Sequence, residues 1–123
     1  MNLTLTIVYM IVVLIVSVVK TSDGVETFAG MDKVLHFLLY GLMGLLWIRV
    51  FLTRRQHSFG GGRPKGVVLK AVAITFLFGL IIEFVQGFLP AREASLYDAL
   101  ANGAGALSGV LLYTLINRCV RIS

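Results

Sequence analysis

Residues 80–102 read LIIEFVQGFLPAREASLYDALAN, a stretch in which a short connection joins two largely apolar segments. Its first half is apolar apart from Glu83 and Gln86, whose i, i+3 spacing places them on one face of a helix. After a short connection at 90–93, a second segment opens with Asp98 and Asn102, whose i, i+4 spacing again gives one face. An ionisable side chain inside an apolar span is by default a candidate for a functional site. The stretch therefore predicts two antiparallel membrane helices that share polar residues.

The composition of the whole chain points to a membrane protein. Of the 123 residues, 58% are hydrophobic and 14% are charged, with a mean hydropathy of +0.91. Soluble domains carry about 25% charged residues. The length allows one compact domain over 1–123, made of a few spans. The net charge of +5 comes from basic residues that flank apolar segments, which favours a membrane-surface role and excludes nucleic acid as the expected partner.

Cysteine and histidine usage predicts neither a disulfide nor a metal centre. Cys119 is the single cysteine, so an internal disulfide and a multi-cysteine metal site are both excluded. The two histidines are His36, inside an apolar segment, and His57, in a polar segment where we expect it to be solvated. One histidine is poor evidence for a metal. The sequence therefore predicts no metal and no cofactor.

The apolar runs predict an all-α fold, a polytopic bundle of four transmembrane helices. The spans are expected at about 3–19, 34–52, 66–89 and 96–117. The first run is short for a span, but no Lys or Arg precedes it and it lacks a small-x-small cleavage site, so it reads as a retained span. Residues 53–65 contain three consecutive glycines and four basic residues, which is typical of a flexible loop. Ser95 suits an N-cap of the last span, and Asp98 suits its first turn.

The distribution of charge predicts the orientation. Most of the 11 Lys and Arg residues fall on the side of the termini and the glycine-rich loop: Arg49, Arg54, Arg55, Arg63, Lys65, Lys70, Arg118 and Arg121. Only Lys20, Lys33 and Arg92 fall on the other side, together with all six acidic residues. The positive-inside rule then places both termini on the cytoplasmic side of the membrane. The membrane is expected to be the cytoplasmic membrane of a bacterial cell.

Three of the predicted spans carry polar residues at the same outer depth. At 1.5 Å per residue, Glu83 lies about 9 Å inside the outer end of the third span, and Asn102 lies about as deep in the fourth. Asp32, His36 and Tyr40 follow one another at i, i+4 and i+8 on the second span and form a stripe. Lipid offers these groups no hydrogen bonds, so the stripes are expected to face one another.

The polar motifs of the chain resemble the signature of the VanZ-like family. The resemblance covers about residues 31–110 and rests on three motifs in the same order: Asp32-Lys33-x-x-His36-Phe37-x-x-Tyr40, then Glu83-Phe84-x-Gln86 with Pro90-x-Arg92, then Asp98-x-x-x-Asn102-x-x-Gly105. Many members have glycine between the proline and the arginine, where this chain has Ala91. The resemblance implies a small integral membrane protein linked to teicoplanin resistance, of a family whose molecular activity is not established.

The polar residues divide into two groups of candidate roles. The candidates for acid–base work are His36, Glu83, Asp32 and Asp98, because an imidazole beside carboxylates can exchange protons. The candidates for binding substrate are Arg92, Lys33, Tyr40, Gln86 and Asn102. Arg92 and Lys33 would hold an anionic headgroup.

Each of these residues also has a structural interpretation. An unpaired, ionised Glu83 at mid-helix costs about 2.5–3.5 kcal/mol, so it is protonated or paired, with His36, Lys33 and Arg92 as candidate partners. The amides of Gln86 and Asn102 are ordinary packing contacts between helices. Tyr40 suits a hydroxyl placed at the membrane interface, where tyrosine is common.

Two functions are consistent with this pattern. In the first, the protein binds or transforms an envelope substrate at the outer leaflet, a membrane lipid or a lipid-linked cell-wall precursor. In the second, it is a non-catalytic scaffold whose polar residues only hold the helices together. The sequence has no serine nucleophile elbow and no HExxH motif, so whether it is an enzyme stays open at this point.

Small residues on the last span predict a close helix contact. Ala101, Gly105 and Gly109 recur every four positions, a small-xxx-small face that lets helices approach. The partner is either another helix of the bundle, with Gly41 and Gly44 as the counterpart on the second span, or a second copy in a homo-oligomer.

Overall fold

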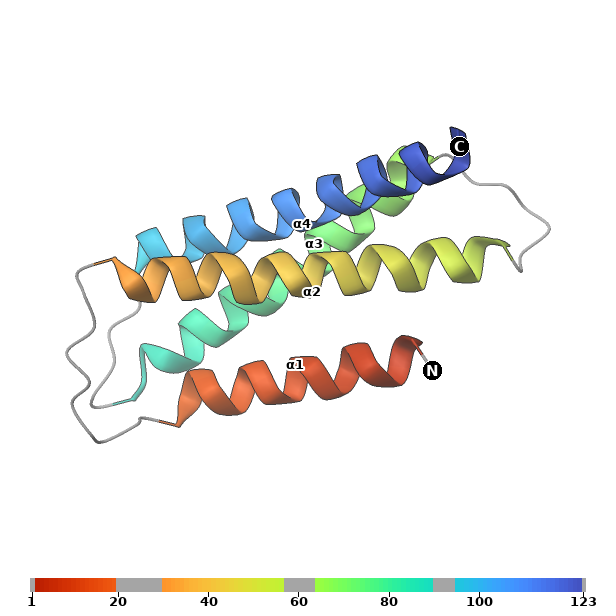
Figure 1. Ribbon diagram of the computed structural model, residues 1–123. Coiled ribbons are helices and arrows are strands. Elements are labelled where there is room, and N and C mark those ends of the chain that lie inside the picture. The colour runs from red at the N-terminus through yellow and green to blue at the C-terminus, as the bar shows by residue number, and fades with distance from the viewer. Residues whose placement is uncertain (1, 20–29, 57–63, 90–94, 123) are drawn as a thin grey trace.

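The structure is a computed structural model that describes residues 2–19, 30–56, 64–89 and 95–122. Within these ranges the chain forms four helices, α1 (Asn2–Val18), α2 (Met31–Gln56), α3 (Pro64–Gln86) and α4 (Leu96–Ile122), which confirms the all-α prediction. Successive helices run in opposite directions, so the two termini lie at the same end of the molecule (Figure 1). We call the opposite end, where α2 and α4 begin and α1 and α3 end, the acidic end, because Asp32 and Asp98 occupy the first turns there.

The helix bounds at the acidic end differ slightly from the expected spans. α2 begins three residues early, directly after Gly30, whose φ of +100° turns the chain into the helix in a conformation that glycine adopts readily. Asp32 thereby lies in the first turn, where the helix dipole favours a carboxylate. α3 ends at Gln86 rather than at Leu89, and residues 87–89 form turns in which the Gly87 amide donates to the Glu83 carbonyl. At the other end α4 continues past residue 117 to Ile122.

The core of the bundle lies between α2, α3 and α4. α4 makes its largest interface with α2 and a smaller one with α3, whereas α1 contacts α2 and α3 but not α4 among the described residues. The fully buried apolar side chains come from all four helices and include Val13, Tyr40, Met43, Ile82 and Val110. α1 therefore lies on the outside of a three-helix core.

Glycines bring the backbones of α2 and α4 close together. A Cβ added to Gly44 would lie 2.6 Å from the Ala106 carbonyl oxygen, and Cβ atoms on Gly105 and Gly109 would overlap the carbonyl groups of Phe37 and Gly41. Glycine is required at such positions because any side chain would push the helices apart. Gly105 and Gly109 thus pack within the bundle, one of the two alternatives that the sequence left open, and a homo-oligomer stays a prediction.

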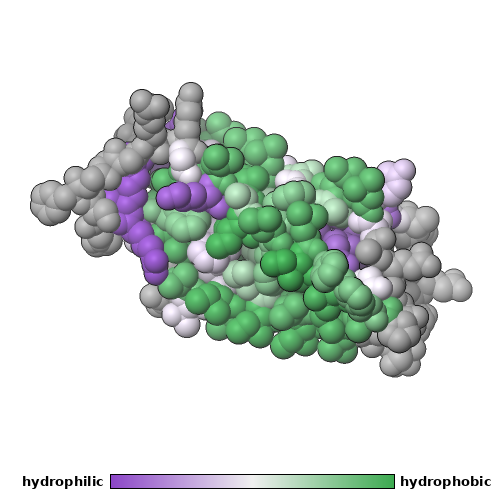
Figure 2. Space-filling model, turned by 180° about the vertical axis from the view of Figure 1, so that it is seen from behind, coloured by the Kyte–Doolittle hydropathy of each residue, from purple (hydrophilic) through white to green (hydrophobic). Residues whose placement is uncertain are grey.

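The outer surface of the bundle suits a membrane. α2, α3 and α4 contain stretches long and apolar enough to cross one, Met31–Arg55, Gly66–Gln86 and Leu96–Val120, and Leu3–Val18 in α1 is a shorter apolar helix. Large apolar side chains such as Ile15, Leu38, Leu69 and Leu115 are exposed. Figure 2 shows these apolar surfaces covering the middle of one face, with hydrophilic residues toward both ends. Such a belt is too extensive for the surface of a soluble monomer.

The contact between α2 and α4 makes a prediction about stability. We expect Gly109→Ala to lower the free energy of unfolding by about 1–3 kcal/mol, because its methyl group must displace the Gly41 carbonyl. Unfolding of the purified protein in detergent measures this change. Gly66→Ala is the matched control, since a Cβ at Gly66 meets nothing within 4 Å. Equal stability of the two variants would contradict the close contact.

Candidate functional site

His36 is the centre of the polar residues at the acidic end. It lies in the second turn of α2 and is 7% exposed. Its Nδ1 lies 2.9 Å from the Asn102 Oδ1 on α4. An amide oxygen only accepts hydrogen bonds, so Nδ1 donates, and in the neutral ring Nε2 carries the lone pair. The bond therefore joins α2 to α4 and also selects the tautomer of the imidazole.

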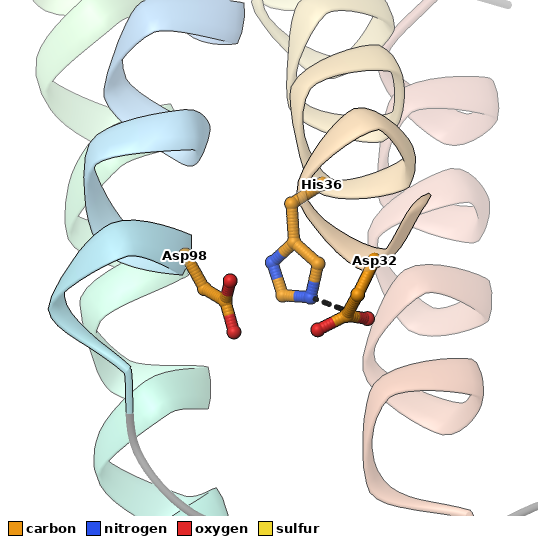
Figure 3. A group of neighbouring side chains, drawn as sticks. All are labelled: Asp32, His36 and Asp98. Atoms are coloured by element: carbon orange, nitrogen blue, oxygen red, sulfur yellow. Dashed lines mark ion pairs between the residues drawn. The ribbon is translucent and has the colours of Figure 1, made fainter. Parts of the chain in front are cut away.

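Three carboxylates lie around this histidine. Its Nε2 lies 3.7 Å from the Asp32 Oδ1 one turn earlier on α2, and its Nδ1 lies 3.7 Å from the Glu83 Oε1 on α3. Figure 3 shows the carboxyl groups of Asp32 and Asp98 on either side of the ring, one from α2 and one from α4. The Lys33 Nζ lies 3.6 Å from the Asp98 Oδ1. We call Asp32, Lys33, His36, Glu83, Asp98 and Asn102 the polar cluster.

Glu83 connects the end of α3 to the start of α4. Its Oε2 accepts a hydrogen bond of 3.2 Å from the backbone amide of Ser95. Ser95 directly precedes α4, and its carbonyl accepts the bond from Ala99, which is the backbone arrangement of an N-cap residue. The Glu83 Oε1 is buried without a hydrogen-bond partner among the described residues. One carboxylate oxygen is thus structural, and the other faces His36.

Burial differs between the members of the polar cluster. Glu83, Asp98 and Asn102 are buried, whereas the side chains of Asp32 and Lys33 are 59% and 47% exposed. The cluster therefore opens to its surroundings on the α2 side. Its three carboxylates face one lysine and one histidine, so its fixed charge is negative.

Gln86 makes a contact between helices, as its structural interpretation predicted, and its candidate role in binding substrate stays a prediction. Its amide Nε2 donates a 2.8 Å hydrogen bond to the Ser17 carbonyl in the last turn of α1, where the carbonyls lack partners within the helix. The hydroxyl of Tyr9 donates likewise to the Leu39 carbonyl on α2. These bonds attach α1 to the core. Sequence reasoning missed both, because a backbone carbonyl leaves no signal in the identity of its residue.

Tyr40 lies inside the bundle, as expected for a stripe that faces the other helices, and not at the membrane interface, which was its alternative structural interpretation. It is 1% exposed, and its hydroxyl has no hydrogen-bond partner among the described residues. It stacks on His36 with ring centroids 6.2 Å apart, one turn deeper in the bundle. Lys33 pairs with Asp98 rather than with Glu83. Arg92 lies outside the described residues.

Comparison with known proteins assigns the chain to a family. The sequence model of VanZ/LLP1 matches residues 3–117. The chain belongs to the VanZ/LLP1 family. The resemblance seen in the motifs is thereby confirmed, and the match also takes in α1. An uncharacterized protein of Schizosaccharomyces pombe is 34% identical over 88 residues, which are 71% of this chain and 49% of that protein. The chain thus spans about half the length of this curated relative. No solved structure matches the chain.

The attachment of α1 can be tested at Gln86. We expect Gln86→Leu to lower the free energy of unfolding by about 1–3 kcal/mol, because it leaves the buried Ser17 carbonyl without its donor at nearly constant side-chain size. Unfolding in detergent gives the free energy, and proteolysis shows whether α1 is released first. Ser108→Ala, at an exposed position on α4, is the control and should be neutral. A neutral Gln86→Leu would contradict this role.

Proposed function

We propose that this VanZ/LLP1 protein crosses the bacterial cytoplasmic membrane four times, with both termini in the cytoplasm. α1, at 17 residues and about 26 Å, nearly matches the hydrocarbon thickness of about 30 Å. It packs beside α2 and α3 and exposes apolar residues along its length, which supports its insertion as a fourth span. Arg54 and Arg55 close α2 at the end where the termini lie, in agreement with the positive-inside rule.

The proposed topology is testable with the single cysteine. Cys119 is exposed near the end of α4, at the end of the bundle opposite the acidic end. We expect a membrane-impermeant maleimide to label Cys119 only after the cells are opened. Asp23→Cys in a Cys119→Ser background, on the opposite side in the proposed topology, should be labelled in intact cells. Labelling of Cys119 in intact cells would reverse the orientation.

We further propose that the polar cluster is an outward-facing site for the headgroup of an envelope lipid or of a lipid-linked cell-wall precursor. The observation that carries this proposal is the convergence of buried polar side chains from α2, α3 and α4 on His36 at the acidic end. Ionisable groups inside membrane spans are costly and are typical of functional sites. The exposed apolar surface beside the cluster suits the lipid tails.

Each side of the site has a separate role in this proposal. Lys33, whose side chain is 47% exposed, contacts the anionic headgroup together with Arg92 in the segment between α3 and α4. His36 and Glu83 supply groups that accept and return a proton within the site. Occupancy or alteration of a cell-wall precursor at this site then accounts for the link between the family and teicoplanin.

The second candidate is a non-catalytic scaffold. It is favoured by the hydrogen bonds that join helices, from His36 to Asn102 and from Gln86 to Ser17. Glu83→Gln separates the two candidates, because the amide keeps the size of the side chain and an oxygen for the Ser95 amide but cannot carry charge. A scaffold tolerates this change, whereas a site that exchanges protons or pairs charges does not.

The decisive experiment expresses the protein in a teicoplanin-sensitive host at matched membrane levels. We expect the wild type to lower drug sensitivity, and Glu83→Gln and Arg92→Ala to lose the effect at equal abundance. Arg118→Ala, which removes an exposed arginine near the other end of α4, is the matched control and should protect like the wild type. Full protection by Glu83→Gln and Arg92→Ala would favour the scaffold.

A further inference from the structure

The structure assembles a set of metal ligands that the sequence did not suggest. One ligand atom from each of Asp32, His36 and Asp98 lies within 4.8 Å of the other two. Asp32 and His36 are one turn apart on α2, and Asp98 comes from the first turn of α4 (Figure 3). Only one of the two histidines, His36, lies inside an apolar segment of the sequence, and one histidine is weak evidence for a metal. The signal that could have found the set is the position of Asp98 at the same depth as the stripe on α2.

Two observations independent of this spacing point to a ligand. The Asp98 Oδ1 is buried without a hydrogen-bond partner among the described residues, on a residue that is 7% exposed, and it forms an ion pair of 3.6 Å with the Lys33 Nζ. The hydrogen bond from His36 Nδ1 to Asn102 leaves the Nε2 lone pair directed toward Asp32. A metal-ligating histidine is commonly oriented in this way by a bond from its other nitrogen.

We propose that Asp32, His36 and Asp98 bind a divalent transition-metal cation. An imidazole combined with two carboxylates is a ligand set suited to first-row divalent ions, and three protein ligands leave positions for water or substrate, as in catalytic zinc sites. Ligand atoms around tetrahedral Zn²⁺ lie about 3.3 Å apart, so shifts on the order of 1 Å close the site. The separation of 3.7 Å between the His36 Nε2 and the Asp32 Oδ1 is already near this value.

The charge of the polar cluster agrees with a cation. Glu83 adds a third carboxylate beside His36, and Lys33 is the only lysine or arginine in the cluster. A divalent ion offsets this excess of negative charge in a buried setting, where an unbalanced charge is expensive. The half-exposed side of Asp32 gives the ion a path from the aqueous phase. If the proposed function holds, the open positions of the ion face the anionic headgroup, whose oxygen atoms complete the coordination; the binding of the metal itself does not rest on that function.

The test uses the full chain in detergent, with Zn²⁺ alone as the probe. We expect titration calorimetry to give one site per chain, and Zn²⁺ to raise the temperature of unfolding because it binds the folded state. His36→Gln should weaken binding by more than about tenfold. His57→Gln, which replaces the chain's other histidine, is the matched control and should bind like the wild type.

Two further variants keep the proposal falsifiable if His36→Gln fails to fold. Asp32→Asn changes a side chain that is 59% exposed, so it should fold, and it should also weaken Zn²⁺ binding by more than about tenfold. Lys33→Gln removes the ammonium that competes for Asp98 and should tighten binding by about two- to fivefold. No saturable binding by the wild type, unchanged binding by Asp32→Asn, or loss of binding in His57→Gln would each overturn the proposal. Because lipid is absent from every titration, these outcomes test metal binding alone. The proposed headgroup site is tested separately by the teicoplanin experiment.

Discussion

The close approach of α2 and α4 sets the distance between the polar residues of the two helices. Glycines on both helices leave no side chains between the two backbones. The carbonyl groups of one helix therefore lie against glycines of the other over several turns. That distance brings His36 within 2.9 Å of Asn102. A wider spacing would leave both polar groups buried without partners, which costs more than the bond itself contributes. The packing of the smallest residues thus determines the chemistry of the most polar ones.

The acidic end of the bundle combines this packing with helix termini. Asp32 and Asp98 lie in first turns, where the positive end of each helix dipole favours a carboxylate. Glu83 lies near the negative end of α3, and the amide of Ser95 at the start of α4 compensates for it. The short connections between antiparallel helices place these termini side by side. The backbone therefore stabilises all three carboxylates: the helix dipoles favour Asp32 and Asp98, and the Ser95 amide donates a hydrogen bond to Glu83.

Much of this arrangement was predictable from the sequence, and the reasons are particular to each residue. Runs of apolar residues predicted the helices, and the spacing of Asp32, His36, Glu83 and Asn102 predicted that they would meet, because lipid offers them no other partners. The partner of Gln86 was not predictable, since a backbone carbonyl can belong to any residue. Periodicity placed Tyr40 on the face that meets the other helices but did not give the neighbour that covers it, which is Gly79 on α3.

The distances along the chain between bonded residues have a consequence for biosynthesis. The Ser17 carbonyl accepts its hydrogen bond from Gln86, which lies 69 residues later in the chain, and Asn102 lies 66 residues after its partner His36. At about 5–20 residues per second, the ribosome needs roughly 3–14 s to supply these partners. During that interval the bond from Tyr9 to Leu39, 30 residues apart, already connects the first two helices. In the nascent hairpin of α1 and α2, Asp32 is therefore the carboxylate that can pair with His36 before Glu83 and Asn102 are made.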